Sequence, residues 1–250
     1  MKKYRGILFD LFATLALWHP EKLPKFSYQG KTIPSTMGKL KTLVEELVTE
    51  VNFDEFYSAF QAVNERNAAE KARFAKEISS LQRFTAILHE VGYPNAPDTV
   101  EIAQRLSLRH MELLAGVVKI PADYAPFLND LRSRYRLALV SNFDHHPTAL
   151  EILKRDGIHD HFHEVVISDS HGYRKPHRRI FADTLQDLSL PADEVLFVGD
   201  SWDDDVVGAQ QAGIDVAWVN PKSKPHGNTG HSPTYEIKDI LGLREILGSA

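Results

Sequence analysis

Short apolar runs alternate with amphipathic stretches along the second half of the chain. The runs are "LALV" (137–140), "EVVIS" (164–168), "VLFV" (195–198) and "VAWV" (216–219), and "ILF" (7–9) near the N-terminus has the same character. Helical patterns such as "HPTALEILKRDG" and "KPHRRIFADTLQDL" lie between them. Strands that are apolar on both faces and are joined by helices are typical of a parallel sheet covered on both sides. We therefore predict an α/β fold with a Rossmann-like, doubly wound parallel sheet.

The stretch from residue 17 to residue 120 follows a different pattern. Two apolar stripes have helical spacing, and their members are Leu40, Leu43, Val44, Leu47, Val48 and Val51, then Ile78, Leu81, Phe84, Ile87, Leu88 and Val91. The segment "HPEKLPKFSYQGKTIPSTMG" (19–38) is rich in Pro, Gly and Lys and is expected to be a loop. The sequence thus predicts an all-helical cap domain, residues 17–120, inserted into a core domain formed by residues 1–16 and 121–250.

Composition narrows the possible partners of the chain. Its 250 residues, 43% of them hydrophobic, suffice for a sizeable core. The net charge of -5 argues against a broad nucleic-acid-binding face. The chain has no cysteine, so disulfides and thiolate metal sites are excluded. No run of residues is long and apolar enough to cross a bilayer, so we expect no membrane partner.

The N-terminus imitates a signal peptide, because Met1, Lys2 and Lys3 precede an apolar stretch. Asp10 interrupts that stretch, and no cleavage site with small residues follows it. We therefore expect a mature cytoplasmic chain.

Polar residues follow several of the predicted strands at the point where each strand ends. Asp10 follows "ILF", Ser141 and Asn142 follow "LALV", and the acidic segment "GDSWDDD" (199–205) follows "VLFV". Lys175 precedes Pro176, which is expected to be the first residue of a helix. In an open parallel sheet, reactive groups gather at the carboxyl ends of the strands. This combination of groups suits a small anionic substrate bound together with a hard cation.

The same segments resemble the four motifs of the haloacid dehalogenase-like (HAD) superfamily. "LFDLFATL" is similar to the first motif, "LALVSN" to the second, "YRKP" to the third and "VLFVGDSWDDDVVGAQQAG" to the fourth. Their order and spacing match, and the helical insert occupies the position of the family's helical C1 cap. The resemblance implies a hydrolase that uses an aspartate nucleophile.

The resemblance and the residue types together suggest a role for each motif residue. Asp10 is expected to attack the substrate and form a covalent ester, which for a phosphoryl group is an aspartyl phosphate. Thr14 and Asn142 are expected to bind substrate oxygens. Ser141 is expected to hold substrate oxygens through its hydroxyl group, and Lys175 to neutralise charge on the nucleophile and on the phosphoryl group.

Mg²⁺ is the cofactor that these motifs indicate. Asp200 and Asp205 are expected to bind the ion alongside Asp10, because carboxylate oxygens are the ligands that Mg²⁺ prefers. The resemblance adds the backbone carbonyl of Phe12 as a further ligand. A carbonyl does not depend on its side chain, so a phenylalanine can supply it.

The side chain of Phe12 departs from the family's phosphatases, which carry a second aspartate at this position. That aspartate protonates the leaving group and then activates water, a contribution of about 10²–10⁴-fold. The family's 2-haloacid dehalogenases commonly have an aromatic residue here and need no metal. A dehalogenase would also need a cation in the cap for the substrate carboxylate, and Arg66 is one candidate.

The fourth motif favours the opposite conclusion. Family dehalogenases typically have Ser and Asn where this chain has Gly199, Asp200 and Ser201. An acidic cluster without a cation would also be costly. The sequence therefore favours a Mg²⁺-dependent phosphatase acting on a small phosphorylated metabolite. A metal-independent 2-haloacid dehalogenase is the first alternative, and a weakly active or non-catalytic binding protein is the second.

Overall fold

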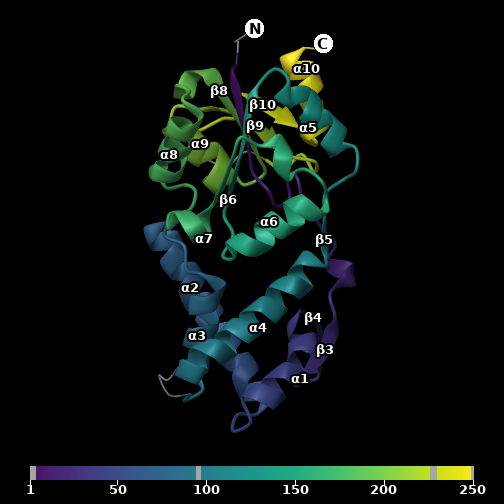
Figure 1. Cartoon of the computed structure of the whole chain (residues 1–250), viewed down its shortest axis with the longest axis vertical. Coiled ribbons are helices and arrows are strands. Elements are labelled where there is room, and N and C mark those ends of the chain that lie inside the picture. The colour runs from purple at the N-terminus through teal and green to yellow at the C-terminus, as the bar shows by residue number, and fades with distance from the viewer. Residues whose placement is uncertain (1–3, 94–96, 226–229, 249–250) are drawn as a thin grey trace. The chain divides into compact units, whose positions relative to one another are not determined.

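The chain divides into two compact units (Figure 1). The computed structural model describes residues 4–93, 97–225 and 230–248. Unit 1 consists of Met1–Trp18, Ala75–Glu77 and Lys119–Ala250, and unit 2 consists of His19–Phe74 and Ile78–Val118. The sequence prediction placed the whole stretch 17–120 in the insert, whereas Ala75–Glu77, from its middle, belongs to unit 1.

Unit 1 contains a six-stranded parallel sheet in the order β10-β9-β8-β1-β6-β7. The strands are β1 (Gly6–Phe9), β6 (Arg136–Ser141), β7 (Glu164–Ile167), β8 (Val195–Gly199), β9 (Asp215–Val219) and β10 (Tyr235–Ile237). The predicted α/β fold with a doubly wound parallel sheet is confirmed. Strand β10 was not predicted, because three residues are too few to show a period. β1 lies between β6 and β8, so Asp10 comes directly after a central strand.

Side chains on successive residues of the sheet point to opposite faces, and each face is covered. Leu8 of β1 belongs to a buried cluster with Phe181 of α8 (Arg178–Leu188) and Ala209 of α9 (Gly208–Gln211). Its neighbours Ile7 and Phe9 are also fully buried, on the opposite face. In Figure 1, α5 (Tyr124–Arg132) and α6 (His146–Arg155) lie on the other side of the strands from α8.

The remaining elements of unit 1 are short helices and turns. They are α7 (Ser168–His171), α10 (Leu243–Leu247), the 3₁₀ turns His159–His161, Ala192–Glu194 and Ile240–Gly242, and a π-helical turn, Trp202–Val207. The prediction that Pro176 opens a helix is wrong, because α8 begins at Arg178 with His177 as its N-cap. Pro176 instead lies in a turn closed by the His177 N–H, which donates to the Arg174 carbonyl at 2.8 Å.

Unit 2 is mainly helical, with α1 (Met37–Leu47), α2 (Phe53–Phe74), α3 (Ser80–Glu90) and α4 (Pro97–Ala115). Their apolar faces form one buried cluster that includes Leu40, Phe56, Phe84 and Leu106. A 3₁₀ turn, Pro20–Lys22, precedes them, and the short strands β2 (Leu17–Trp18) and β5 (Val118–Lys119) lie where the chain leaves and re-enters unit 1. No helix of the described residues is long and apolar enough to cross a membrane.

The predicted loop at 19–38 is partly wrong, because it contains a β-hairpin. β3 (Lys25–Tyr28) pairs antiparallel with β4 (Lys31–Pro34). The two turn residues, Gln29 and Gly30, have φ of 46° and 73°, as a tight hairpin turn requires. The ring of Phe26 packs edge-on against Tyr57 of α2 at 4.9 Å, so the hairpin is held by tertiary packing that composition does not reveal.

Candidate active site

The carboxyl ends of β1, β6 and β8 bring the motif residues of unit 1 together. The Asp10 N–H donates to the Val198 carbonyl at 2.9 Å, which fixes the start of the loop after β1 against β8. A pocket of about 180 Å³ lies at this edge of the sheet. Six of the predicted site residues line it, namely Asp10, Phe12, Asn142, Lys175, Asp200 and Asp205.

Lys175 forms the centre of the charge network in this pocket. Its Nζ lies 2.6 Å from Asp10 Oδ1 and 2.7 Å from Asp205 Oδ1, and its side chain is only 1% exposed. Burial disfavours the charged ammonium group, but the Asp10 and Asp205 carboxylates outweigh burial and raise the pKa of Lys175. Lys175 therefore stays cationic and directs its charge at the predicted nucleophile.

One ammonium group does not balance the acidic side chains of the pocket. Asp10, Asp200 and Asp205 each offer a carboxylate oxygen, and these three atoms lie within 4.8 Å of one another. Burial, together with Asp205, raises the pKa of Asp10 to about 7 against the opposing effect of Lys175. Burial and Asp205 also raise the pKa of Asp200 to about 6. Three hard oxygen donors in a negatively charged, partly desolvated cluster fit a divalent cation such as Mg²⁺.

The segment that follows β8 is folded to present these carboxylates. The Ser201 N–H donates to Asp205 Oδ2 at 2.9 Å, and the Ser201 hydroxyl accepts from the Asp204 N–H at 3.3 Å. A Cβ atom at Gly199 would overlap the Asp205 carboxylate, so only glycine leaves room for this arrangement. The Trp218 indole donates to the Asp200 carbonyl at 2.9 Å and holds the backbone of that residue.

Asn142 is committed to the scaffold more than the sequence suggested. Its Nδ2 group donates to the Lys175 carbonyl at 2.9 Å and to Asp204 Oδ2 at 3.1 Å. Its Oδ1 accepts from the Lys175 N–H at 2.7 Å. Asn142 thus fixes the backbone of Lys175 through both ends of its amide.

Ser141 and Thr14 do not line the pocket, and both are buried. Their hydroxyl oxygens have no hydrogen-bond partner among the described residues. A buried hydroxyl without a partner is costly, and a substrate oxygen could satisfy it. The substrate-binding roles of Thr14, Ser141 and Asn142 stay predictions.

Three polar residues of the pocket, Arg174, Ser201 and Asp204, were not among the predicted site residues. Asp204 lies in the acidic run of the fourth motif, and Arg174 precedes Lys175 in the third. Burial and Asp205 raise the pKa of Asp204, against the opposing charges of Lys175 and Arg174. Their position within the motifs was the available signal, but neighbouring acidic residues cannot be ranked by sequence alone.

Glu77 was missed because it lies far from every motif in the sequence. Its side chain is only 2% exposed, and its Oε2 accepts from the Ser168 hydroxyl at 2.5 Å and from Arg174 Nη1 at 3.4 Å. The Ser168 hydroxyl in turn accepts from the Phe143 N–H at 2.9 Å. The backbone N–H of Glu77 donates to the Gly172 carbonyl at 3.1 Å. Glu77 thus connects the loops that carry the second and third motifs.

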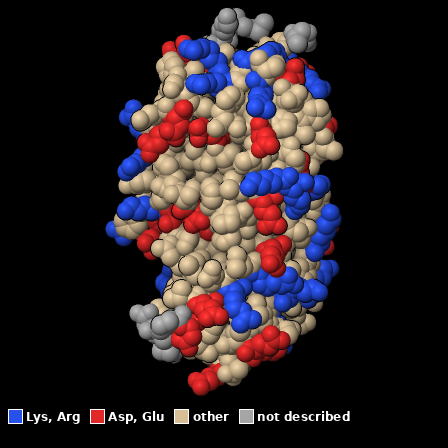
Figure 2. All heavy atoms as spheres, viewed as in Figure 1, with Lys and Arg blue, Asp and Glu red and all other residues tan. Residues whose placement is uncertain are grey.

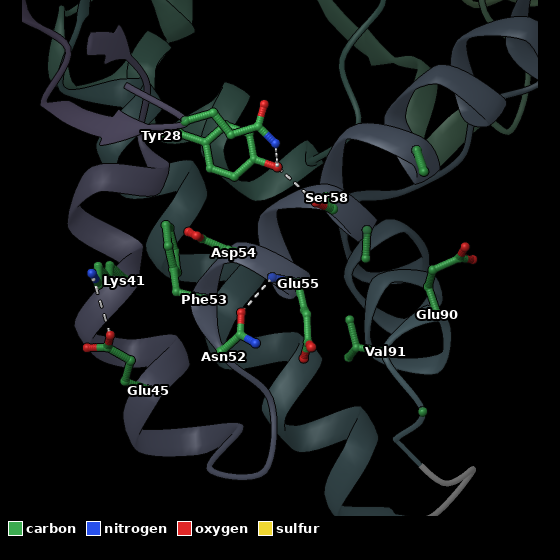
Figure 3. A pocket seen from close by; sticks show the side chains of 14 residues that line it. Tyr28, Lys41, Glu45, Asn52, Phe53, Asp54, Glu55, Ser58, Glu90 and Val91 are labelled. Carbon is green, nitrogen blue, oxygen red and sulfur yellow. Dashed lines mark hydrogen bonds and ion pairs between the residues drawn. The ribbon is translucent and has the colours of Figure 1, made fainter. Parts of the chain in front are cut away.

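A much larger cavity, about 1190 Å³, lies in unit 2 (Figure 3). Its labelled side chains come from the β3–β4 hairpin, α1, α2 and the end of α3, and Tyr28 hydrogen bonds to Ser58 at 2.9 Å. Its charged side chains lie at the surface, and three of them are paired: Lys41 with Glu45 at 3.7 Å, and Glu90 with Arg66, which does not line the cavity, at 2.7 Å. The cavity has no buried, mutually interacting carboxylates, so its size alone does not indicate chemistry.

Arg66, the candidate cation for a dehalogenase, is thus bonded to Glu90.

On the face shown in Figure 2, acidic and basic side chains are interspersed rather than separated into areas of one sign.

The chain belongs to the haloacid dehalogenase-like hydrolases, because the model of that family matches residues 4–213. The predicted superfamily and the predicted hydrolase class are thereby confirmed. Relatives named for different activities are similar over nearly the whole chain. A glyceraldehyde 3-phosphate phosphatase of Methanopyrus kandleri is 29% identical and covers 97% of this chain and 97% of its own. An (S)-2-haloacid dehalogenase of Pseudomonas putida is 29% identical and covers 99% of both.

Solved structures show the same fold. A 2-haloacid dehalogenase from Pseudomonas syringae superposes with a TM-score of 0.72 at 22% identity and covers 98% of both chains. The HAD-hydrolase YfnB from Bacillus subtilis, bound to magnesium, superposes with a TM-score of 0.61 at 24% identity, over 99% of this chain and 100% of its own. The comparisons therefore establish the family, and its relatives include both phosphatases and 2-haloacid dehalogenases. The residues of the site must be used to choose between these two reactions.

Proposed function

We propose that this protein is a Mg²⁺-dependent phosphatase that acts on a small phosphorylated molecule through Asp10. The observation that carries the proposal is the cluster of Asp10, Asp200 and Asp205, whose ligand oxygens lie within 4.8 Å of one another. Four aspartates and two cationic side chains line the pocket, so negative charge is in excess there. A site for a metal-independent reaction has no need of this excess, which keeps the nucleophile partly protonated near neutral pH.

Asp10, Asp200 and Asp205, with the Phe12 carbonyl, would hold the ion. When bound, Mg²⁺ supplies positive charge that lets the carboxylate and the anionic substrate approach. It is the fit of the oxygen donors that supports this assignment, together with the magnesium bound by the structural neighbour YfnB.

The residues of the chain divide the reaction into two displacements at phosphorus. A carboxylate oxygen of Asp10 attacks, the bond between phosphorus and the leaving oxygen breaks, and that oxygen departs with the electron pair. Water then attacks the phosphorus of the aspartyl phosphate, the bond to Asp10 breaks, and phosphate leaves with the proton of the water passing to solvent. Lys175 stays 2.6 Å from Asp10 and stabilises the charge that accumulates in both steps.

Phe12 restricts which leaving groups this chemistry can release. No proton donor stands at that position, so leaving groups that are stable anions should depart readily and alkyl alcohols should not. We expect acetyl phosphate to be cleaved about 10²–10⁴-fold faster than glycerol phosphate, the usual size of a general-acid contribution.

A 2-haloacid dehalogenase is the second candidate, and two observations favour it. Phe12 is aromatic, and the P. putida dehalogenase is 29% identical over 99% of the chain. In that reaction the Asp10 carboxylate would displace halide from carbon, and water would then hydrolyse the ester.

One panel separates the two candidates. Phosphate release from acetyl phosphate and glycerol phosphate, and chloride release from 2-chloropropionate, are measured with Mg²⁺ and with chelator. The proposal expects chelator-sensitive phosphate release and no chloride. Chloride release that survives the chelator would overturn it in favour of the dehalogenase. The variant Phe12→Asp should speed glycerol phosphate hydrolysis, because it supplies the absent acid.

A further inference from the structure

An aromatic wall of three rings, Phe12, Trp18 and Phe143, adjoins the pocket of Asp10, and of the three only Phe12 lines it. The ring of Phe12 lines the pocket and stacks on Trp18, with centroids 5.3 Å apart and ring planes 25° apart. Phe12 also contacts Phe143, with centroids 4.6 Å apart. All three residues belong to unit 1.

The loop after β1 is folded so that Trp18 returns to Phe12. The N–H groups of Leu15 and Ala16 both donate to the Leu11 carbonyl, at 2.9 and 2.7 Å, and the Ala13 N–H donates to the Ala16 carbonyl at 2.8 Å. Ala13 adopts a φ of 62°, which is uncommon for a residue other than glycine. Backbone in such conformations persists where the surrounding structure holds it, often at ligand sites.

Two hydrogen bonds of its backbone hold Phe143 in place. Its N–H donates to the Ser168 hydroxyl at 2.9 Å, and its carbonyl accepts from the Asp169 N–H at 3.2 Å. Hydrogen bonds therefore hold the backbone that carries both ring partners of Phe12, in the loop that leads to Trp18 and at Phe143.

These rings are not simply part of the hydrophobic core. Trp18 is 39% exposed and its neighbour Leu17 is 37% exposed, and both are among the few large apolar side chains of the described residues with such exposure. Phe12 and Phe143 are only half-buried. An exposed aromatic surface that adjoins a reactive carboxylate is available to a flat, unsaturated part of a substrate.

The side chain at position 12 also restricts the leaving group of the substrate, independently of the aromatic contacts. Because Phe12 cannot donate a proton, the leaving oxygen must be stable as an anion. An oxygen attached to an aromatic ring meets this requirement, and the ring itself could stack on the wall. We infer that Phe12, Trp18 and Phe143 form a leaving-group subsite, and that the preferred substrates are aryl phosphates. This inference rests on the proposed phosphatase function.

The test compares two substrates whose leaving groups depart without a general acid. Only one of these leaving groups contains an aromatic ring. The value of kcat/KM with Mg²⁺ is measured for p-nitrophenyl phosphate and acetyl phosphate, and their ratio is compared between variants so that intrinsic reactivity cancels. Trp18→Leu should lower the ratio about 5- to 10-fold, mainly through KM for the aryl substrate, as expected for the loss of one ring contact. Trp18→Tyr, which retains a ring, should restore most of the ratio.

The matched control is Phe74→Leu, because Phe74 is also an exposed aromatic residue, 52% exposed, but it belongs to unit 2 and is not one of the rings that contact Phe12. It should leave the ratio unchanged. An equal decrease for both substrates in Trp18→Leu, or no decrease for either, would overturn the subsite.

A binding measurement separates failure of the subsite from failure of the proposed function. Calorimetry with phenylphosphonate and methylphosphonate, in the presence of Mg²⁺, needs no turnover. If the wild type hydrolyses neither phosphate, the phosphatase proposal fails, but tighter binding of phenylphosphonate that Trp18→Leu abolishes would still support the subsite. Equal affinity for the two phosphonates in the wild type would overturn it.

Discussion

Two cavities among the described residues differ in size and in charge, and the smaller one is the one that we propose carries the chemistry. The cavity in unit 2 measures about 1190 Å³ and the pocket of Asp10 about 180 Å³. Acidic side chains line both. In unit 2 they lie at the surface, where water solvates each one, whereas at Asp10 they are partly or fully buried and face one another. Interaction between desolvated charges, rather than volume, is the reason we propose the pocket of Asp10 as the reactive site.

The proposed nucleophile, Asp10, provides the largest expected contrast between the two cavities. Asp10→Asn keeps the shape of the side chain and removes the attacking charge, so turnover of acetyl phosphate should fall by at least about 10⁴-fold. The matched variant in the large cavity, Asp54→Asn, should retain wild-type turnover. Steady-state phosphate release, with far-ultraviolet circular dichroism to verify folding, provides the measurement. Substantial turnover by Asp10→Asn would exclude the covalent mechanism.

The proposed metal ligands should give the next largest effect. Asp200→Ala and Asp205→Ala each remove one carboxylate oxygen from the cluster, and we expect Mg²⁺ affinity to fall by more than about tenfold, with Asp200 the more severe. Glu55→Ala in the large cavity serves as the control. Isothermal titration with Mg²⁺ measures the affinity. Wild-type protein that does not bind Mg²⁺ would argue for the dehalogenase.

Glu77 tests whether the buried link between the motif loops stabilises unit 1. Glu77→Ala removes the carboxylate that accepts from Arg174 and from the Ser168 hydroxyl, which as a donor keeps only its longer contact with the Phe143 carbonyl at 3.2 Å, so the free energy of unfolding should fall by about 1–3 kcal/mol. Glu77→Gln retains an acceptor for Ser168 and should lose less. Urea unfolding gives both values. Equal losses in the two variants would mean that the charge of Glu77, not its hydrogen bond to Ser168, is what matters.

The smallest predicted effect is a pH dependence that Mg²⁺ removes. Asp10 and Asp200 have folded-state pKa values raised to about 7 and about 6, so the folded metal-free protein binds more protons than the unfolded chain between about pH 4 and 7. Their contribution to stability must therefore decrease as pH rises through this window. Thermal unfolding of wild type and Asp10→Asn isolates the contribution, since the variant lacks one of the two groups.

With saturating Mg²⁺, the difference between the pH profiles of wild type and Asp10→Asn should shrink, because the cation replaces the protons. A difference that is the same with and without Mg²⁺ would show that the ion does not interact with Asp10.

Much of unit 1 could be predicted because its signals are local in sequence. Five of the six strands are apolar runs bounded by helical patterns, and the residues at their ends are the ones that a parallel sheet brings together. Asp10, Asn142 and Asp200 illustrate this, since each follows a strand directly and all three line the same pocket.

The features that were missed depend on contacts between distant residues. Ala75–Glu77 belongs to unit 1 through pairing with Gly172 and Arg174, nearly a hundred positions away, and nothing in the local pattern marks it. The β3–β4 hairpin has ordinary loop composition and is held by the rings of Phe26 and Tyr57. Pro176 precedes its helix instead of opening it, because a turn from Arg174 to His177 intervenes.

The central claim, that Asp10 attacks phosphorus with the aid of Mg²⁺ and without an acid at position 12, predicts a covalent intermediate that accumulates. The second displacement also lacks a general base at Phe12, so water should attack slowly and the first turnover should appear as a burst.

The direct measurement is rapid acid quenching of the reaction with p-nitrophenyl phosphate and Mg²⁺, followed by peptide mapping by mass spectrometry. The account predicts a burst of nitrophenol and a phosphoryl group on the peptide that contains Asp10, both abolished by chelator and by Asp10→Asn. An unmodified Asp10 during turnover, or an ester of Asp10 formed from 2-chloropropionate in the presence of chelator, would contradict it.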